Sequence, residues 1–216
     1  MSFMFYVIAF YVYSLELFLI IIIVIMITLC FATNNVGKLK EIQALLGNTY
    51  QVQSLQDIGC TEEIAETGTT IEENSKIKAQ YIWEKYGVNC FADDTGLEVA
   101  ALNNAPGVYS ARYAGSECIA DDNMKLLLKN LNSSEDKSAR FKTVITLVIN
   151  GVYHTFEGIV SGAIIEEKRG ANGFGYDPIF VPKGFTQTFA EMDMETKNSI
   201  SHRGKAVAAL IDFLKK

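Results

Sequence analysis

Two adjacent aspartates, Asp93 and Asp94, are the residues of this sequence best suited to chemistry. They follow a short apolar run, residues 88–92, that has the character of a strand, and Thr95 and Gly96 come next. Because aspartate is a poor strand former, the pair predicts that the strand ends here, at the mouth of a sheet where α/β proteins bind ligands. Two neighbouring carboxylates favour a hard divalent cation. A plain turn with Asp-Thr-Gly at its corner is the alternative explanation.

A polar turn, residues 33–38 (Thr-Asn-Asn-Val-Gly-Lys), is the second candidate site. It joins an expected first strand ending at Ala32 to a helix with an apolar face. Free backbone N–H groups and the dipole at a helix N-terminus favour anions, and Lys38 adds a positive charge. The turn lacks the glycine and Ser/Thr of a Walker P-loop. An ordinary helix start with a solvated lysine is the alternative.

Two later stretches could also bind a ligand. Residues 170–178 contain closely spaced glycines around Phe174 and Tyr176, so the backbone can approach a ligand while a ring stacks on a base, although a plain turn is the alternative. His202 and Arg203 fall in the first turn of a helix, where the dipole disfavours cations. Their position, with Lys197 nearby, predicts a negative or carbonyl-rich ligand.

The elements that must position these residues follow from hydrophobic periodicity and turn signals. A capping box of Thr70 and Glu73 opens one helix, Ser201 is a natural N-cap for the last helix, and Asn150-Gly151 is a strong hairpin signal. Strand–helix units beside a hairpin predict an α/β protein with a mixed sheet. Expected helices cover residues 39–46, 70–86, 121–131 and the stretch after Ser201, and expected strands cover 26–32, 51–54, 88–92, 97–101, 139–149 and 152–165.

Composition excludes several classes of function. The 216-residue chain has a net charge of −6 and a pI of about 5.0, which argues against a nucleic-acid-binding surface. Its four cysteines are widely spaced with no C-x-x-C pair, as expected for reduced thiols in a cytoplasmic protein. With only two histidines, a metal site built from several of them is not expected.

Residues 1–25 form an unusually apolar leader. About 20 apolar residues can cross a bilayer, but a basic region and a small-residue cleavage site of a secretory signal are missing. We predict that the working domain covers residues 26–216, starting near Met26. The leader is then either a membrane anchor or a start-site artefact, and any membrane contact would run through residues 1–25 only. A cytoplasmic protein is expected, with a membrane-anchored one as the alternative.

Six motifs in order make the chain resemble the inosine/xanthosine triphosphate pyrophosphatase family over about residues 27–214. They are Thr-Asn-Asn-x-x-Lys, Glu-Thr-Gly, Ala-Asp-Asp-Thr-Gly-Leu, Ala-Pro-Gly-Val-Tyr-Ser-Ala-Arg-Tyr, Gly-Phe-Gly-Tyr-Asp-Pro and Ser-His-Arg. The resemblance implies a long mixed β-sheet with flanking helices in two lobes around a central cleft, usually as a homodimer. It also implies Mg²⁺-dependent hydrolysis of noncanonical purine nucleoside triphosphates (ITP, dITP, XTP) to the monophosphate and pyrophosphate.

The resemblance also implies roles for particular residues. Asp94 would accept the proton of the attacking water, and Glu66 and Asp94 would hold Mg²⁺. Hypoxanthine and xanthine present a 6-oxo acceptor that His202 or Arg203 can satisfy, whereas adenine presents an amino donor there. The implied substrate-binding residues are Thr33, Asn34, Asn35, Val36, Gly37, Lys38, Lys78, Thr95, Phe174, Gly175, Tyr176, Asp177, Lys197, His202 and Arg203.

Two competing functions fit the same residues. One is a pyrophosphatase of the septum-inhibitor type, which would act on other modified nucleotides such as methylated dTTP or UTP. The other is a nucleotide sensor without catalytic activity, although the intact carboxylates and lysines argue against it.

Overall fold

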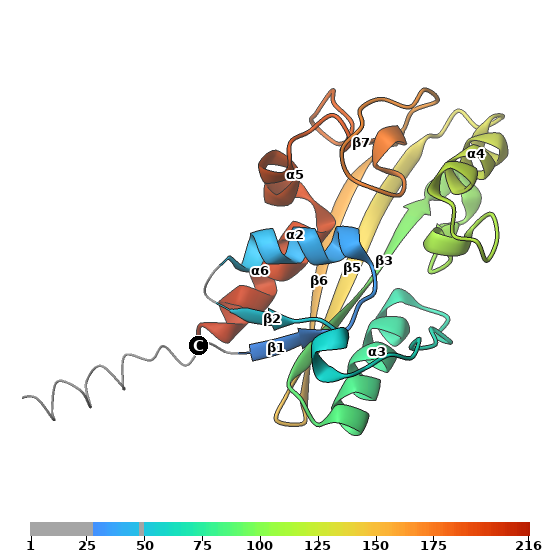
Figure 1. Cartoon of the computed structure of the whole chain (residues 1–216). Coiled ribbons are helices and arrows are strands. Elements are labelled where there is room, and N and C mark those ends of the chain that lie inside the picture. Colours follow the sequence, from blue (N-terminus) through green and yellow to red (C-terminus); the bar gives the residue numbers. More distant parts are fainter. Residues whose placement is uncertain (1–27, 48–49) are drawn as a thin grey trace, which may run out of the picture.

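The computed structural model describes residues 28–47 and 50–216, and in these residues the chain forms a mixed sheet of seven strands (Figure 1). The strand order is β2-β1-β3-β5-β6-β7, with β4 paired to β3; β1 is parallel to β2 and β3, and the other pairs are antiparallel. The strands are β1 Thr28–Phe31, β2 Gln51–Gln53, β3 Cys90–Val99, β4 Pro106–Gly107, β5 Ser138–Ile149, β6 Val152–Ile164 and β7 Phe180–Pro182. The α-helices are α2 Val36–Leu46, α3 Ile71–Tyr86, α4 Ala120–Leu131, α5 Met194–Ile200 and α6 His202–Leu214.

The hairpin of β5 and β6 gives the sheet its length. Its turn is Asn150-Gly151, with φ angles of 49° and 79°, and Ile149 pairs with Val152 across it. Two positive φ angles in a two-residue loop match the twist of the flanking strands. The predicted hairpin is therefore confirmed.

Helices cover both faces of the sheet at the end that contains β1, as side-chain alternation along the strands requires. Phe31 and Phe91 stack with their ring centroids 4.6 Å apart and pack with α2 and α6. Their neighbours Cys30 and Cys90 face the opposite way and pack with α3. In Figure 1, α2 and α6 accordingly lie on one side of the strands and α3 on the other.

A separate apolar cluster fills the other end of the sheet. It joins α4 to the far ends of β3 and β5 and to residues 176–192, which follow β6. Its fully buried members include Leu97, Leu127 and Phe180. The predicted α/β fold, a long mixed sheet with helices packed in two lobes, is confirmed.

One prediction about the central strand is wrong. The strand does not end at the aspartate pair, and Asp-Thr-Gly does not form a turn, because β3 continues to Val99. It pairs with β5 over its whole length, with Asp93 opposite Ile145. The parallel neighbour β1 stops at Phe31, opposite Phe91, so the two aspartates lie just beyond the point where β1 leaves the sheet.

The predicted helix caps are confirmed. Thr70 accepts a hydrogen bond from the backbone N–H of Glu73, whose side chain accepts one from the N–H of Thr70. Ser201 caps α6 by accepting from the N–H of Gly204. Helix α2 begins at Val36, earlier than predicted, which places Lys38 within its first turn.

No helix in the described part of the chain is long and apolar enough to cross a membrane. The predicted leader, residues 1–25, and its boundary with the domain at Met26 lie outside the described residues and stay predictions.

Gly158 on β6 lets α6 approach the sheet closely. A Cβ atom at this position would clash with the carbonyl oxygen of His202 and lie 2.6 Å from the backbone nitrogen of Ala206. We expect Gly158→Ala to lower the free energy of unfolding by about 1–3 kcal/mol, because overpacking forces backbone shifts. Urea unfolding measures it, with exposed Ser161→Ala on the same strand as the control. An unchanged midpoint for Gly158→Ala would show that α6 can move away from the sheet.

Candidate active site

A cleft of about 680 Å³ collects most of the predicted site residues. Both ends of the sheet contribute to the cleft, together with the start of α2 and one side of α3. Residues 170–178, which precede β7 and which we call the glycine-rich loop, add to its lining. Val36 and Gly37 do not line it: Val36 is exposed, and Gly37 packs beneath the ring of Phe174. The predicted residues that line the cleft are Thr33, Asn34, Asn35, Lys38, Glu66, Lys78, Asp94, Thr95, Phe174, Gly175, Tyr176, Asp177, Lys197, His202 and Arg203.

The side chains of Asp93 and Asp94 point to opposite faces of β3. Lys38 on α2 donates from Nζ to Oδ1 of Asp93 at 2.9 Å, and Arg203 on α6 donates to its Oδ2 at 3.2 Å. Asp94 points the other way, toward α3, where Lys78 Nζ lies 3.8 Å from its Oδ1. Alternation along the strand therefore assigns one carboxylate to each side.

Asp94 is the carboxylate with spare coordinating capacity. Its side chain is buried, and its Oδ2 has no hydrogen-bond partner among the described residues. Burial raises the pKa of Asp94, and the charges of Lys78 and Lys38 offset this only in part. A buried carboxylate oxygen without a donor is a strong candidate ligand for a cation.

Glu66 completes the acidic part of the cleft. Lys78 forms ion pairs with both Glu66 and Asp94, so its ammonium lies between the two predicted metal ligands. Burial alone would lower the pKa of Lys78, but the two carboxylates raise it overall. Burial alone would raise the pKa of Glu66, but the charge of Lys78 lowers it overall. Lys78 therefore stays charged next to the position expected for the triphosphate.

Asp93 carries its charge inside the protein. It is 1% exposed, and burial alone would raise its pKa, but Lys38 and Arg203 lower the pKa well below its ordinary value. The ionised form of Asp93 holds the guanidinium of Arg203, whose Nη2 also donates to Thr95 Oγ1 at 3.1 Å. Asp93 is thus a positioning residue, while Asp94 remains available.

Glu41 on α2 connects the same arginine to the glycine-rich loop. Its carboxylate accepts from Arg203 Nη1 and from Lys197 Nζ, the latter at 2.5 Å. Lys197 also donates to Asp177 Oδ2 at 2.8 Å, and that oxygen accepts from the N–H of Phe174 at 2.7 Å. These buried ion pairs fix α2, α5, α6 and the glycine-rich loop relative to one another.

An aromatic side chain and a neutral histidine lie at this end of the cleft. Lys197 Nζ lies 5.0 Å from the ring centroid of Phe174. His202 stacks on Phe141 with centroids 4.6 Å apart, and its Nδ1 has no partner among the described residues. Burial, together with the charge of Arg203, lowers the pKa of His202 well below its ordinary value. The imidazole is therefore neutral at physiological pH and can offer a nitrogen to a ligand.

The start of α2, where an anion site is predicted, is a capped helix N-terminus. Asn35 caps the helix, with its Oδ1 accepting from the N–H of Lys38 at 3.0 Å, and its own N–H donates to Thr33 Oγ1. Thr33, Asn34, Asn35 and Lys38 all line the cleft.

Sequence reasoning missed Glu41 and the buried role of Asp93. Glu41 does lie three residues after Lys38 on one helix, a spacing that places them on the same side. Its partners Lys197 and Arg203, however, lie 156 and 162 residues further along the chain. No local signal could have identified that pairing.

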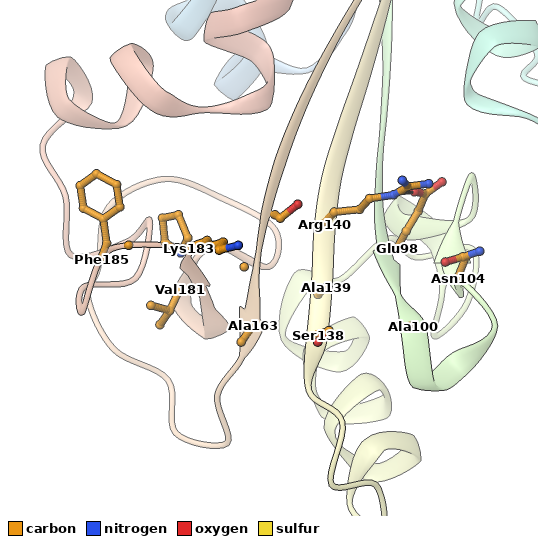
Figure 2. Close-up of a pocket in the computed structure, with 14 residues that line it drawn as sticks. Glu98, Ala100, Asn104, Ser138, Ala139, Arg140, Ala163, Val181, Lys183 and Phe185 are labelled. Carbon is orange, nitrogen blue, oxygen red and sulfur yellow. Dashed lines mark hydrogen bonds and ion pairs between the residues drawn. The ribbon is translucent and has the colours of Figure 1, made fainter.

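A second cavity, of about 670 Å³, lies at the far end of the sheet (Figure 2). Its charged lining residues are Glu98, Arg140 and Lys183, and the first two form an ion pair. No predicted site residue lines it. Of these two cavities, only the first cleft contains predicted site residues.

Fold and site together define an α/β protein equipped to bind a phosphorylated ligand with an aromatic part. The cleft has lysines and a helix N-terminus for the anionic groups, unpartnered carboxylate oxygen for a cation, and Phe174 for a ring. Residues 29–213 match the Ham1 family, and the chain belongs to that family.

Relatives and solved structures agree with this assignment. Proteins named dITP/XTP pyrophosphatase from Flavobacterium johnsoniae and Flavobacterium psychrophilum are 58% and 54% identical, over 86% and 87% of this chain and 97% and 98% of theirs. The Ham1 protein structures of Staphylococcus aureus and Coxiella burnetii are 38% and 39% identical to this chain, with TM-scores of 0.80 and 0.81. The two matches cover 87% and 88% of this chain, and 98% and 99% of the chains in those structures. The predicted family is confirmed, and its named relatives belong to the predicted enzyme class, nucleoside triphosphate pyrophosphatase.

Proposed function

We propose that this protein hydrolyses noncanonical purine nucleoside triphosphates (ITP, dITP and XTP) to the monophosphate and pyrophosphate, with Mg²⁺ as cofactor. The observation that carries the proposal is the buried, partly unpartnered carboxylate of Asp94 beside Lys78 and Glu66 in the cleft that also contains Phe174. The names of the relatives support dITP and XTP as substrates.

The donor set fits Mg²⁺. No group of three or more His, Cys, Asp or Glu residues with metal-binding geometry occurs in residues 28–47 and 50–216. Mg²⁺ typically takes one or two carboxylates and completes its shell with water and substrate phosphates, so Asp94 and Glu66 suffice. Mg²⁺ bound there supplies charge neutralisation for the triphosphate.

The chain's own residues supply the remaining steps. The N-terminus of α2, Lys38 and Lys78 bind phosphate oxygens and hold the triphosphate in the cleft. Asp94 accepts a proton from the water that attacks the phosphorus, which requires its ionised form. Burial raises the pKa of Asp94, and the charges of Lys78 and Lys38 oppose this rise and so favour the ionised form.

Selectivity for the purine follows from His202 and Arg203, which both line the cleft. Arg203 directs its N–H groups at Glu41, Asp93 and Thr95, whereas Nδ1 of the neutral His202 has no partner. His202 with a proton on Nδ1 would donate to a 6-oxo group, while adenine would place an amino donor against it. A mispaired buried donor is rejected strongly.

The assembly and location belong to the same proposal. The family resemblance implies a homodimer, which sedimentation can test. The free cysteines Cys30, Cys60, Cys90 and Cys118 suit a reducing cytoplasm, which cell fractionation can test.

A panel of nucleoside triphosphates assayed with the full chain tests the function. With Mg²⁺ we expect pyrophosphate release from ITP, dITP and XTP to be at least about 100-fold faster than from ATP, because a buried donor left unsatisfied costs up to about 3 kcal/mol. Chelation with EDTA should abolish it. Preference for UTP or methylated dTTP would favour the septum-inhibitor type, and ITP binding without turnover would favour a sensor.

A further inference from the structure

One motif of the sequence, residues 105–113, has no role in the proposed function; we call residues 105–116, which contain it, the strap. The strap lines one part of the cleft, and Ser110 ties it to the sheet. The hydroxyl of Ser110 accepts from the N–H of Leu97 at 2.8 Å and donates to the carbonyl of Gly107 at 2.6 Å. The phenol of Tyr176 donates to the carbonyl of Ser110 at 2.9 Å. The strap is thus fixed both to β3 and to the glycine-rich loop.

A third anchor comes from α4. Asn123 is 3% exposed, and its amide donates to the carbonyl of Ala111 at 2.8 Å and accepts from the N–H of Ala114 at 2.7 Å. These two bonds bracket Arg112, so its backbone is held on both sides. Such buried side-chain bonds to the main chain fix a loop position closely.

The side chain of Arg112 is much less constrained than its backbone. Its Nη1 lies 3.6 Å from Oε2 of Glu66, longer than a hydrogen bond, and its guanidinium lies 5.2 Å from the ring centroid of Tyr109. Within the described residues it forms no hydrogen bond, and its side chain is 34% exposed. Arg203, the other arginine lining the cleft, is buried with its donors bonded to acidic residues. Arg112 is therefore the arginine that can accept an anionic ligand.

We propose that Arg112 is a further catalytic residue, which binds the pyrophosphate part of the substrate as it leaves. This inference rests on the proposed function. From the floor of the cleft outward, Asp94 contacts Lys78, Lys78 contacts Glu66, and Glu66 contacts Arg112. The phosphorus attacked by water lies at Asp94. Arg112, three contacts further out, meets the phosphates beyond it.

The chemistry of arginine suits this position. Its planar fork binds two phosphate oxygens at once, and a charge that grows on the leaving group makes this contact stronger in the transition state. The pairing with Glu66 keeps the side chain in the cleft before substrate binds. When Glu66 serves as a cation ligand, the triphosphate is the remaining anion near Arg112.

Binding of the two products to the full chain tests the proposal. We would measure inorganic pyrophosphate with Mg²⁺, and IMP separately, by calorimetry on wild type, Arg112→Gln and Arg112→Lys. The expected result is a loss of pyrophosphate affinity of about 10- to 100-fold for Arg112→Gln, with a smaller loss for Arg112→Lys and IMP unchanged. Arg140→Gln, which also removes an arginine from an ion pair with glutamate, is the matched control and should bind both products normally.

Kinetics with ITP supply the second readout. Arg112→Gln should lower kcat more than it raises KM, because the contact strengthens as the bond breaks. Unchanged pyrophosphate binding, equal losses for pyrophosphate and IMP, or a wild type that does not bind pyrophosphate would each overturn the assignment. Absence of ITP hydrolysis by a wild type that binds pyrophosphate through Arg112 would instead refute the proposed activity and leave the contact established.

Discussion

Asp94→Asn should lower kcat for ITP by about 10²- to 10⁴-fold, the range that a general base contributes. Asparagine keeps the shape of the side chain but cannot accept the proton of the attacking water, and it is a weaker ligand for a cation. Substrate binding should change much less, since Lys38, Lys78 and the N-terminus of α2 remain. Single-turnover pyrophosphate release measures the effect, with exposed Asp212→Asn on α6 as the control.

The stability of Asp94→Asn should not fall with its activity. Burial raises the pKa of Asp94 in the fold above its unfolded value, so its negative charge at neutral pH disfavours the folded chain without Mg²⁺. Asparagine removes that charge, and the urea midpoint should stay equal or rise. A rate within tenfold of wild type would exclude Asp94 as the base, and a lower midpoint would contradict the pKa argument.

Local signals in the sequence were sufficient for much of the fold. The hairpin at Asn150-Gly151, the capping box of Thr70 and Glu73, and the cap at Ser201 each depend on backbone groups within a few residues. Such interactions are encoded by short segments, whatever the rest of the chain does. The elements that frame the site could therefore be predicted.

The aspartate pair could not be placed correctly for the opposite reason. Low strand propensity predicts that the strand stops before Asp93, yet tertiary context overrides propensity in sheets. The charges that allow Asp93 inside a buried strand come from Lys38 and Arg203, 55 and 110 residues away. Strand propensity depends on residues that are close in sequence, whereas Lys38 and Arg203 come close to Asp93 only in the folded chain.

The site shows the same division. The motifs identified residues that gather in the cleft, including Asp94, Phe174 and His202, because each carries a recognisable chemical group. They did not distinguish a side chain open to ligand from one already paired inside the protein. Only the contacts reveal that the guanidinium of Arg203 is bonded to Asp93 and Glu41, whereas the side chain of Arg112 forms only a long contact with Glu66.

Arg203→Ala should lower the free energy of unfolding by about 3–5 kcal/mol, because removing one partner of a buried ion pair leaves uncompensated charge. Arg203 is 1% exposed, and its loss would leave Asp93 with Lys38 alone and Glu41 with Lys197 alone. Urea unfolding measures the effect, with Arg140→Ala as the control: its pair with Glu98 is far more exposed, so a change below about 1 kcal/mol is expected.

Arg203→Lys separates the stability of the network from recognition of the base. Lysine keeps the positive charge near Asp93 but loses the fork that reaches Asp93 and Glu41 together. Because the N–H groups of Arg203 are bonded to Glu41 and Asp93, we expect stability to fall in this variant while the ratio of kcat/KM for ITP over ATP is kept. The same ratio should fall by more than tenfold in His202→Ala, whereas a loss of preference in Arg203→Lys would show that Arg203 reads the 6-oxo group. Comparing Arg203→Lys with His202→Ala therefore assigns base recognition to one of two adjacent side chains.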